Sequence, residues 1–343
     1  MMQIGCHCGP QSGLHGVVQF QPRFQPSRPS MKIVFCAPGK NSQPWIDALA
    51  ANLPQARVWS WSTEQAHGAD APQADYAVVW APPAELFTAQ HHLRAVFNIG
   101  AGVDGVTKLA NLPRDIPIVR LNDAGMAVQM AEYVCHALIR HAREFDVYAG
   151  QAAASEWRTH RAIDRAAWPV GVMGLGSIGA RVAQAVAGFE YPTFGWSRTL
   201  ATLPGVTTFA GPDQLDIFVR SVRVLVCLLP LTVETAGILN RQTLSKLMPG
   251  GYLINVARGQ HLVEQDLLDL LGSGALAGAT LDVVADEPLP AQHVFWQHPN
   301  ITLTPHISAI TLLMESAMQI AKKIQALERG EAIDGAVAWA RGY

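Results

Sequence analysis

Three side chains suited to acid–base chemistry and anion binding follow short apolar runs in the second half of the chain. Arg258 lies in NVARG, Glu287 in DVVADEP and His306 in TPHIS. A histidine exchanges a proton near neutral pH, a carboxylate orients its ring, and an arginine is a charged donor for an anion. Singly, each is unremarkable, and His306 alone would be interpreted as a capped or core histidine. They become informative together, because they come in this order after a dinucleotide-type turn.

That turn is Gly174-x-Gly176-x-x-Gly179, within VGVMGLGSIGARVAQAVAGF. It follows an apolar strand pattern and opens a helical one, which is the context that a dinucleotide-binding turn requires. Gly174 permits the tight turn, Gly176 lets the backbone approach a pyrophosphate, and Gly179 lets the helix meet the strand. The phosphates then lie at the positive end of the helix. The alternative is a strand–helix turn with incidental glycines.

The second strand of this unit ends in FGWSRT, where an acidic side chain would bond a ribose 2′-hydroxyl and repel a 2′-phosphate. Ser197, Arg198 and Thr199 stand there instead. Hydroxyls and a guanidinium are donors, and arginine pairs well with phosphate. The segment predicts a preference for NADPH/NADP, with NADH/NAD as the second cofactor. The alternative is a solvated loop arginine.

The elements around these residues form an alternating pattern. Apolar strand-like runs at 32–36, 56–61, 76–81, 95–99 and 116–121 are separated by helical patterns, and six more follow at 169–174, 193–197, 222–230, 251–257, 278–284 and 300–305. Alternation of this kind predicts parallel βαβ units and an α/β fold. One long helix is expected over 126–151, packed between domains or subunits, and a last helix over 311–331.

Bulk composition sets limits on the partners. The 343 residues are 49% hydrophobic and 15% charged, with a formal net charge of -2, so about two ordinary domains are expected. Neither a basic excess nor an apolar run of spanning length occurs, which excludes nucleic-acid and membrane partners. No metal-binding motif is evident. Cys36, Cys135 and Cys227 lie in apolar runs and are expected to be reduced core residues, as in a cytoplasmic protein. Residues 1–30 are interpreted as a disordered or non-native extension.

From about residue 31 to 343 the chain resembles the D-2-hydroxyacid dehydrogenases, most closely the branch of glyoxylate/hydroxypyruvate reductases. The stretches that carry the resemblance are VWAPP, FNIGAGVD, WSRT, FAG, LLPLTVETAGILN, NVARG, LDVVADEPLP, FWQHP, TPHISAIT and ARGY. The resemblance implies two Rossmann-like, doubly wound parallel-sheet domains with an interdomain cleft. It assigns 31–122 plus 311–343 to a substrate domain and 123–310 to an NADP-binding domain. It also implies a homodimer formed through the helix that begins near Met126.

The implied reaction is hydride transfer to C2 of a small 2-keto acid, turning glyoxylate into glycolate and hydroxypyruvate into D-glycerate. Arg258 anchors and polarises the substrate, His306 is the acid/base, and Glu287 orients it. Backbone N–H groups of a glycine-rich turn hold the carboxylate. This donor turn consists of Ala101, Gly102 and Val103. The cofactor set comprises Gly174, Leu175, Gly176, Ser177, Ile178, Gly179, Ser197, Arg198, Thr199, Leu229, Pro230, Val256, Ala257, Arg258 and Asp282.

Aromatic residues bear on the size of the pocket. Trp80 and Met126 are expected to contact substrate, with a core position as the alternative for Trp80, and a crowded pocket favours small keto acids. Trp45 and Trp157 are interpreted as core residues; the alternatives are the cleft for Trp45 and the partner subunit's site for Trp157. Two other functions stay open. One is a related dehydrogenase for phosphoglycerate or a bulkier keto acid, and the other is a dinucleotide-sensing interaction protein on the same fold.

Overall fold

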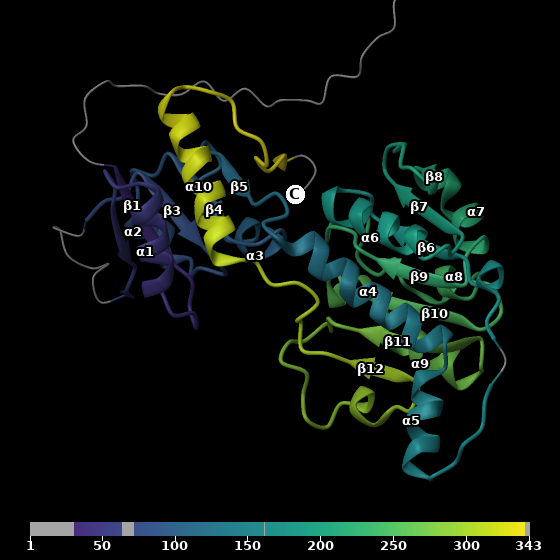
Figure 1. The fold of residues 1–343 in the computed structure, drawn as a ribbon. Helices are drawn as coiled ribbons and strands as arrows, with labels where there is room; N and C mark the ends of the chain where they lie inside the picture. Colours follow the sequence, from purple (N-terminus) through teal and green to yellow (C-terminus); the bar gives the residue numbers. More distant parts are fainter. Residues whose placement is uncertain (1–30, 64–71, 161, 340–343) are drawn as a thin grey trace, which may run out of the picture.

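The computed structural model describes residues 31–63, 72–160 and 162–339. The predicted N-terminal extension and the terminal ARGY stretch lie outside the described residues. Two all-parallel sheets, of five and seven strands, form the two lobes of the molecule (Figure 1). The predicted α/β class with two parallel sheets is therefore confirmed. None of the described helices is long and apolar enough to cross a bilayer.

The smaller sheet has the strand order β2-β1-β3-β4-β5. Its strands are β1 (Lys32–Cys36), β2 (Arg57–Ser60), β3 (Tyr76–Val79), β4 (Ala95–Asn98) and β5 (Ile118–Arg120), with helices α1 (Gln43–Asn52), α2 (Glu85–Ala89) and α3 (Asp104–Thr107). Every residue of β3 and β4 is buried. Buried faces on both sides are what parallel strands covered by helices require.

The larger sheet has the order β12-β11-β10-β9-β6-β7-β8. Its strands are β6 (Val170–Met173), β7 (Thr193–Ser197), β8 (Thr207–Ala210), β9 (Val224–Cys227), β10 (Gly251–Asn255), β11 (Leu276–Leu281) and β12 (Ile301–Leu303). The sequence pattern indicated six of these and missed β8. This strand, TTFA, lies at the sheet edge and none of its residues is fully buried, so it has no continuous apolar run.

Helices of the second lobe flank this sheet. They are α6 (Ser177–Gly188), α7 (Leu215–Arg220), α8 (Arg241–Leu244) and α9 (Glu264–Gly272), with the 3₁₀ turns η2 (Arg165–Ala167), η3 (Pro212–Gln214), η4 (Gly259–His261) and η5 (Val294–Gln297). The topological switch of the sheet falls between β6 and β9. Open α/β sheets bind ligands at the carboxyl ends of strands at such a point.

The single long helix expected over 126–151 is in fact two. Helix α4 spans Met126–Ala142 and α5 spans Phe145–Ala153. Glu144, between them, has a left-handed φ of 54°, which a continuing helix cannot contain. In Figure 1, α4 crosses from the smaller lobe along the larger one, where it packs against α6. The apolar pattern predicted a helix but carried no mark of this change of direction.

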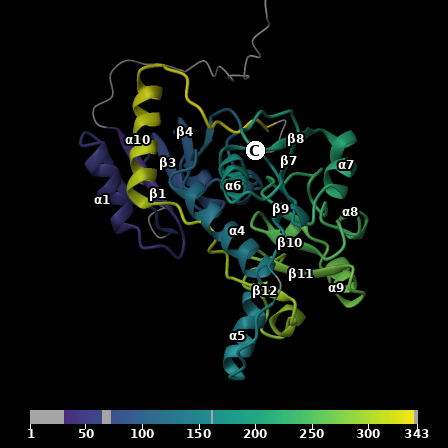
Figure 2. The ribbon, with the colours of Figure 1, turned by 45° about the vertical axis from the view of Figure 1, so that its right-hand side comes forward.

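The chain returns to the first sheet after β12. Helix α10 (Leu313–Glu328) lies along α1, as Figures 1 and 2 both show. Beyond it, the Arg120 N–H donates to the Gly335 carbonyl and the Val337 N–H to that of Ile118. The segments after β5 and after β12 both pass between the lobes, and the Leu312 N–H donates to the Ala124 carbonyl there. The domain boundaries assigned from the sequence stay a prediction.

Candidate active site

A cavity of about 430 Å³ lies between the two lobes, at the carboxyl ends of both sheets. Its walls include residues after β3 and β4 on one side and after β10, β11 and β12 on the other. They are Trp80, Ala81, Asn98, Gly102, Asp104, Gly105, Val106, Arg258, Gly259, Gln260, Val284, Ala285, Glu287 and His306. The fold thus brings together Arg258, Glu287 and His306, three side chains far apart in the sequence.

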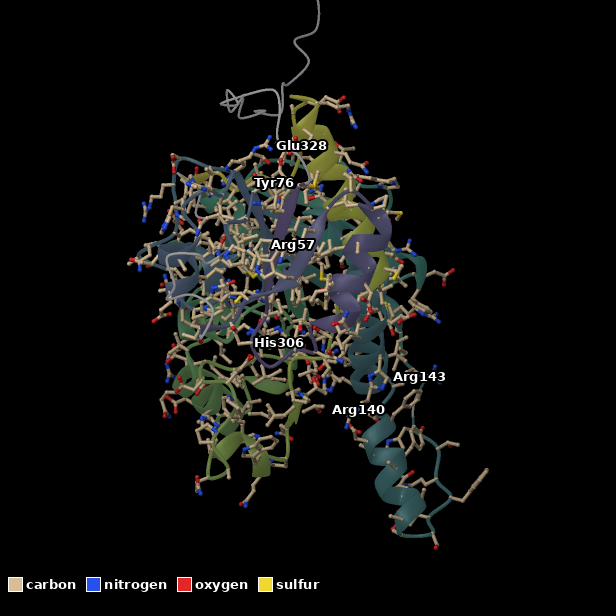
Figure 3. The ribbon with its side chains drawn as sticks, turned by 90° about the vertical axis from the view of Figure 1, so that its left-hand side faces the viewer. Arg57, Tyr76, Arg140, Arg143, His306 and Glu328 are labelled. Atoms are coloured by element: carbon tan, nitrogen blue, oxygen red, sulfur yellow. The ribbon has the colours of Figure 1, made fainter. Side chains whose placement is uncertain are left out.

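His306 and Glu287 form a hydrogen-bonded pair. The His306 Nδ1 lies 2.8 Å from Glu287 Oε2, and both side chains are 39% exposed. The other carboxylate oxygen, Oε1, accepts from the Val284 N–H at 3.2 Å. With Nδ1 facing a carboxylate, the ring carries its proton there and Nε2 is the nitrogen left for proton exchange. Figure 3 labels His306 at the level where the two lobes meet.

Asp282 holds the loop that carries His306. Its carboxylate accepts from the Thr304 hydroxyl at 2.6 Å and from the N–H groups of Ile307 and Ser308 at 2.8 Å each. The Asp282 carbonyl also accepts from the His306 N–H. The side chain is buried and lies outside the cavity walls. Its carboxylate fixes the loop that carries His306, and the predicted contact of Asp282 with the cofactor stays a prediction.

Arg258 is held across the cleft. Its Nε donates to Asp104 Oδ1 at 3.1 Å and its Nη1 to the Ala257 carbonyl at 2.7 Å. Its Nη2 lies toward Gly102, where a built Cβ atom would come within 1.6 Å of it. Asp104 was quoted only as part of a motif, and nothing in the sequence paired it with an arginine 154 positions away. The pair places a guanidinium of one lobe against the glycine-rich turn of the other.

That turn presents three N–H groups. The buried Asn98 amide donates to the carbonyls of Gly100 and Gly102 at 3.0 and 2.8 Å, and so fixes the loop after β4. Within the described part of the chain, the N–H groups of residues 101–103 donate to no other group. Consecutive N–H donors beside a guanidinium suit an anion. Val103 is buried, so it offers only its backbone. Asn98 was not predicted.

The dinucleotide turn has the geometry that its glycines predict. Gly174 has a φ of +97°, and a Cβ atom on Gly179 would lie 1.8 Å from the Gly174 carbonyl oxygen. Around Gly176 nothing lies within 4 Å of a Cβ position, so a ligand has room to approach the backbone. Ser177 is exposed and begins α6, a helix of 12 residues whose N-terminal N–H groups favour a phosphate. These residues fit a dinucleotide cofactor.

The remaining cofactor candidates follow the neighbouring strands of the same sheet. Leu229 and Pro230 follow β9, and Val256 and Ala257 follow β10. Leu175 and Ile178, within the turn, are half-buried against the core of this lobe. Since parallel strands end at one edge, the set forms a continuous rim from β7 to β10.

The loop after β7 carries the selectivity candidates. Ser197 Oγ donates to the Thr199 carbonyl at 2.7 Å, and Arg198 is exposed. Glu234, in the loop after β9, has a lowered pKa. The main cause is a hydrogen bond with the Thr232 side chain, and the charge of Arg198 contributes a smaller part. No acidic side chain occupies positions 197–199, so a 2′-phosphate meets no repelling group within this loop.

The predictions for the tryptophans and for Met126 have different outcomes. Trp80 lines the cavity. Trp45 is a core residue as predicted, stacked on Phe35 with ring centroids 5.6 Å apart. Trp157 is fully exposed, so its interpretation as a core residue was wrong. Met126, named as a substrate contact, is buried at the start of α4 and is absent from the cavity walls.

Comparison with known proteins decides the family. A family model described as "D-isomer specific 2-hydroxyacid dehydrogenase, NAD binding domain" matches residues 135–308. A glyoxylate/hydroxypyruvate reductase A from Serratia proteamaculans (strain 568) is 45% identical over 318 residues, which cover 91% of this chain and 100% of the relative. This chain belongs to the D-isomer specific 2-hydroxyacid dehydrogenase family. The predicted resemblance is confirmed, and with it an NAD(P)-dependent oxidoreductase.

Solved 2-hydroxyacid dehydrogenases share the whole fold. A family member from Xanthobacter autotrophicus Py2, in complex with NADPH and MES, is 36% identical with a TM-score of 0.87, covering 92% of this chain and 100% of that one. An NADPH-dependent glyoxylate/hydroxypyruvate reductase from Sinorhizobium meliloti, in complex with NADP and sulfate, is 33% identical with a TM-score of 0.86 and the same coverage. NADP(H) is thus bound by two relatives of this dehydrogenase.

Proposed function

We propose that this chain reduces small 2-keto acids with NADPH, converting glyoxylate to glycolate and hydroxypyruvate to D-glycerate. The observation that carries the proposal is a single cavity whose walls include Arg258, Gly102 of the donor turn and the Glu287–His306 pair. A keto acid presents a carboxylate next to a carbonyl. The cavity offers anion donors on one side and a proton donor on the other.

The carboxylate of the substrate is assigned to the glycine-rich turn and to Arg258. Hydrogen bonds to a carboxylate are charge-assisted whether a backbone N–H or a guanidinium donates them, and the guanidinium adds a full positive charge. Asp104 holds Nε of that guanidinium, which leaves Nη2 facing Gly102 and the turn. The same cation stabilises negative charge that develops on the keto oxygen. Arg258 is therefore both anchor and polariser.

The proton is assigned to His306. Bound NADPH supplies the hydride that reaches C2 of the keto acid. The keto oxygen then gains negative charge and takes the Nε2 proton of His306, giving the hydroxyl group. Glu287, at Nδ1, stabilises the imidazolium before the transfer and keeps the ring oriented after it. In the reverse direction the neutral ring accepts the same proton.

The choice of NADPH rests on Ser197 and Arg198. The loop after β7 offers a hydroxyl and a guanidinium and lacks an acidic side chain. The two NADP(H)-bound relatives support this preference. The choice of small keto acids rests on Trp80, whose indole forms part of the cavity wall and takes space from a longer substrate side chain.

The assembly and the compartment are part of the same proposal. Val128, Phe145, Val147 and Trp157 on and after helices α4 and α5 are large apolar side chains exposed to solvent, which suits a homodimer formed through these helices. The free cysteines Cys36, Cys135 and Cys227 are buried, which suits a reducing cytoplasm.

Initial rates test the function. Glyoxylate, hydroxypyruvate and pyruvate are each supplied with NADPH and with NADH, and the highest kcat/KM is expected for the first two with NADPH. His306→Asn should lower kcat by about 10²-fold or more, while NADPH still binds by fluorescence titration. His92→Asn, an exposed histidine of the other lobe, is the control. Near-normal turnover of His306→Asn would remove the acid/base assignment.

A further inference from the structure

His261 is a buried histidine for which the proposed reaction has no use. It ends the 3₁₀ turn η4, three residues after Arg258, and its side chain has no exposed surface. Gly259 and Gln260 line the cavity, but His261 does not. A buried imidazole needs hydrogen-bond partners, and those it has lie on two separate segments of the site.

Its ring nitrogens bridge these segments. Nδ1 lies 3.2 Å from the Arg258 backbone nitrogen, and Nε2 lies 3.3 Å from the Pro230 carbonyl oxygen. Pro230 belongs to the loop after β9, next to the dinucleotide turn, whereas Arg258 follows β10. One ring therefore contacts the backbone of the substrate anchor and the backbone of the cofactor rim.

Only one tautomer satisfies both contacts. The Arg258 nitrogen can only donate, so Nδ1 must accept; the Pro230 carbonyl can only accept, so Nε2 must carry the proton. Nδ1 also lies 3.0 Å from the Arg258 carbonyl oxygen, but that oxygen already accepts from the Asn255 amide and from the His261 N–H. A proton on Nδ1 would leave Nε2 facing the Pro230 oxygen with two lone pairs opposed.

Burial favours the same neutral ring. It lowers the pKa of His261, and the charge of Arg258 lowers it slightly further. The neighbouring Asp104 and the backbone partners act in the opposite direction and are outweighed. The imidazole thus keeps both an acceptor and a donor available, because protonation would add a hydrogen to the nitrogen that has to accept.

We propose that His261 is a positioning residue that sets the backbone of Arg258 with Nδ1 and the backbone of Pro230 with Nε2–H. It acts through these two neighbours and touches neither substrate nor cofactor. The contact with Arg258, here called the Arg258 arm of the proposal, rests on the proposed function, because it assumes that Arg258 receives the keto acid. The contact with Pro230, the Pro230 arm, concerns the cofactor rim alone.

Two carboxamide variants separate the two contacts, because each places one polar atom near the position of one ring nitrogen. In His261→Asn the side-chain oxygen takes the place of Nδ1, so the Arg258 contact survives and the Pro230 contact is lost. In His261→Gln the amide nitrogen takes the place of Nε2, so the Pro230 contact survives and the Arg258 contact is lost. One lost hydrogen bond corresponds to about a tenfold change in an equilibrium. Each variant should therefore raise the KM of one reactant only, and a different one in each case.

The experiment measures KM for glyoxylate and for NADPH, with NADPH binding by fluorescence. His261→Asn should raise KM for NADPH about tenfold and leave that for glyoxylate within about twofold; His261→Gln should do the reverse. His298→Asn, in the same lobe and outside the site, is the control. Thermal unfolding of all variants accounts for any loss of folded protein.

Two results would overturn the proposal. If both variants keep wild-type KM values, His261 positions nothing; if both lower kcat equally with KM unchanged, it is only structural. Should the wild type reduce no keto acid, the proposed function fails by itself. NADPH binding by the two variants still tests the Pro230 arm in that case. Should His261→Asn not fold, the glyoxylate KM of His261→Gln still decides the Arg258 arm.

Discussion

Arg258 reaches the glycine-rich turn only because position 102 has no side chain. A Cβ atom there would lie 1.6 Å from Nη2 and 3.1 Å from the carboxylate of Asp104. The atom in the way is the far end of a flexible side chain, so the fold can adapt while the guanidinium moves. At this scale, function depends on small displacements of charged groups, since catalysis loses rate steeply with misplacement.

Gly102→Ala should therefore reduce activity without unfolding the protein. We expect kcat/KM for glyoxylate to fall by about 10²-fold, because the anchor moves away from the carboxylate site, with the midpoint of thermal unfolding little changed. Gly188→Ala is the control: it closes helix α6 outside the cavity walls, and nothing is within 4 Å of its Cβ position. Equal loss of kcat/KM in both variants would contradict the role given to position 102.

Arg198→Asp should reverse the cofactor preference. An acid after β7 repels a 2′-phosphate and can bond a ribose hydroxyl, so kcat/KM should fall by about 10²-fold or more with NADPH and little with NADH. Arg198→Gln removes the charge alone. Its kcat/KM with NADPH should lie between that of the wild type and that of Arg198→Asp. A similar fall with both cofactors, or a wild type that prefers NADH, would make Arg198 a solvated side chain only.

At the scale of elements, parallel strands explain why the site assembles. Each strand ends at the same edge of its sheet, and two such edges face one another across the cavity. Apolar runs predicted eleven of the strands from the sequence, because buried parallel strands are apolar throughout. The edge strand β8 and the break at Glu144 were missed: β8 has no apolar run, and the break is one left-handed residue that the spacing of apolar residues does not record.

Helix α4 also introduces a pH dependence of stability. His141 stacks on Tyr252 with ring centroids 3.8 Å apart, and burial, with a smaller contribution from Arg223, lowers its pKa from 6.5 to about 4. As the pH falls below about 6.5, His141 therefore binds a proton in the unfolded chain while it is still neutral in the folded one. The stability of the folded state should decline from there to about pH 4, by at most about 1.4 kcal/mol per pH unit for this group.

His141→Phe tests this dependence, because it keeps a ring against Tyr252 and Trp168 but cannot titrate. Urea unfolding at pH 7.0, 5.5 and 4.5 should give a smaller decline for the variant than for the wild type. His261 and the other titrating groups are common to both proteins and cancel in the difference. Parallel curves would mean that His141 is protonated as easily in the folded state as in the unfolded one.

At the scale of the molecule, the two lobes meet along a cavity, while α4 runs along the larger lobe and α5 projects beyond it (Figure 1). Arg140 and Arg143, labelled in Figure 3, mark the α4–α5 junction, and Phe145 and Val147 stand exposed just beyond it. Large apolar side chains gathered on neighbouring helices suit a partner surface.

Phe145→Asp combined with Val147→Asp should weaken the proposed dimer. Charges buried at an apolar interface cost more than the contacts they replace, so light scattering should show a monomer at micromolar concentration where the wild type is a dimer. Ile217→Asp, at a more exposed apolar side chain on α7, should leave the mass unchanged. A monomeric wild type would remove the proposal, and a dimeric double variant would place the interface elsewhere.

The sequence by itself determined the α/β class, the dinucleotide turn, and which arginine, glutamate and histidine belong together, because strand runs, glycine spacing and residue chemistry are local properties. Only the tertiary structure decided how these groups are held. Asp104 pairs with Arg258 across the lobes, Asn98 fixes the donor turn, and Asp282 and His261 support the site from buried positions. Such partners lie far along the chain or act through backbone atoms, and neither residue type nor spacing records which donor a folded chain will bring to which acceptor.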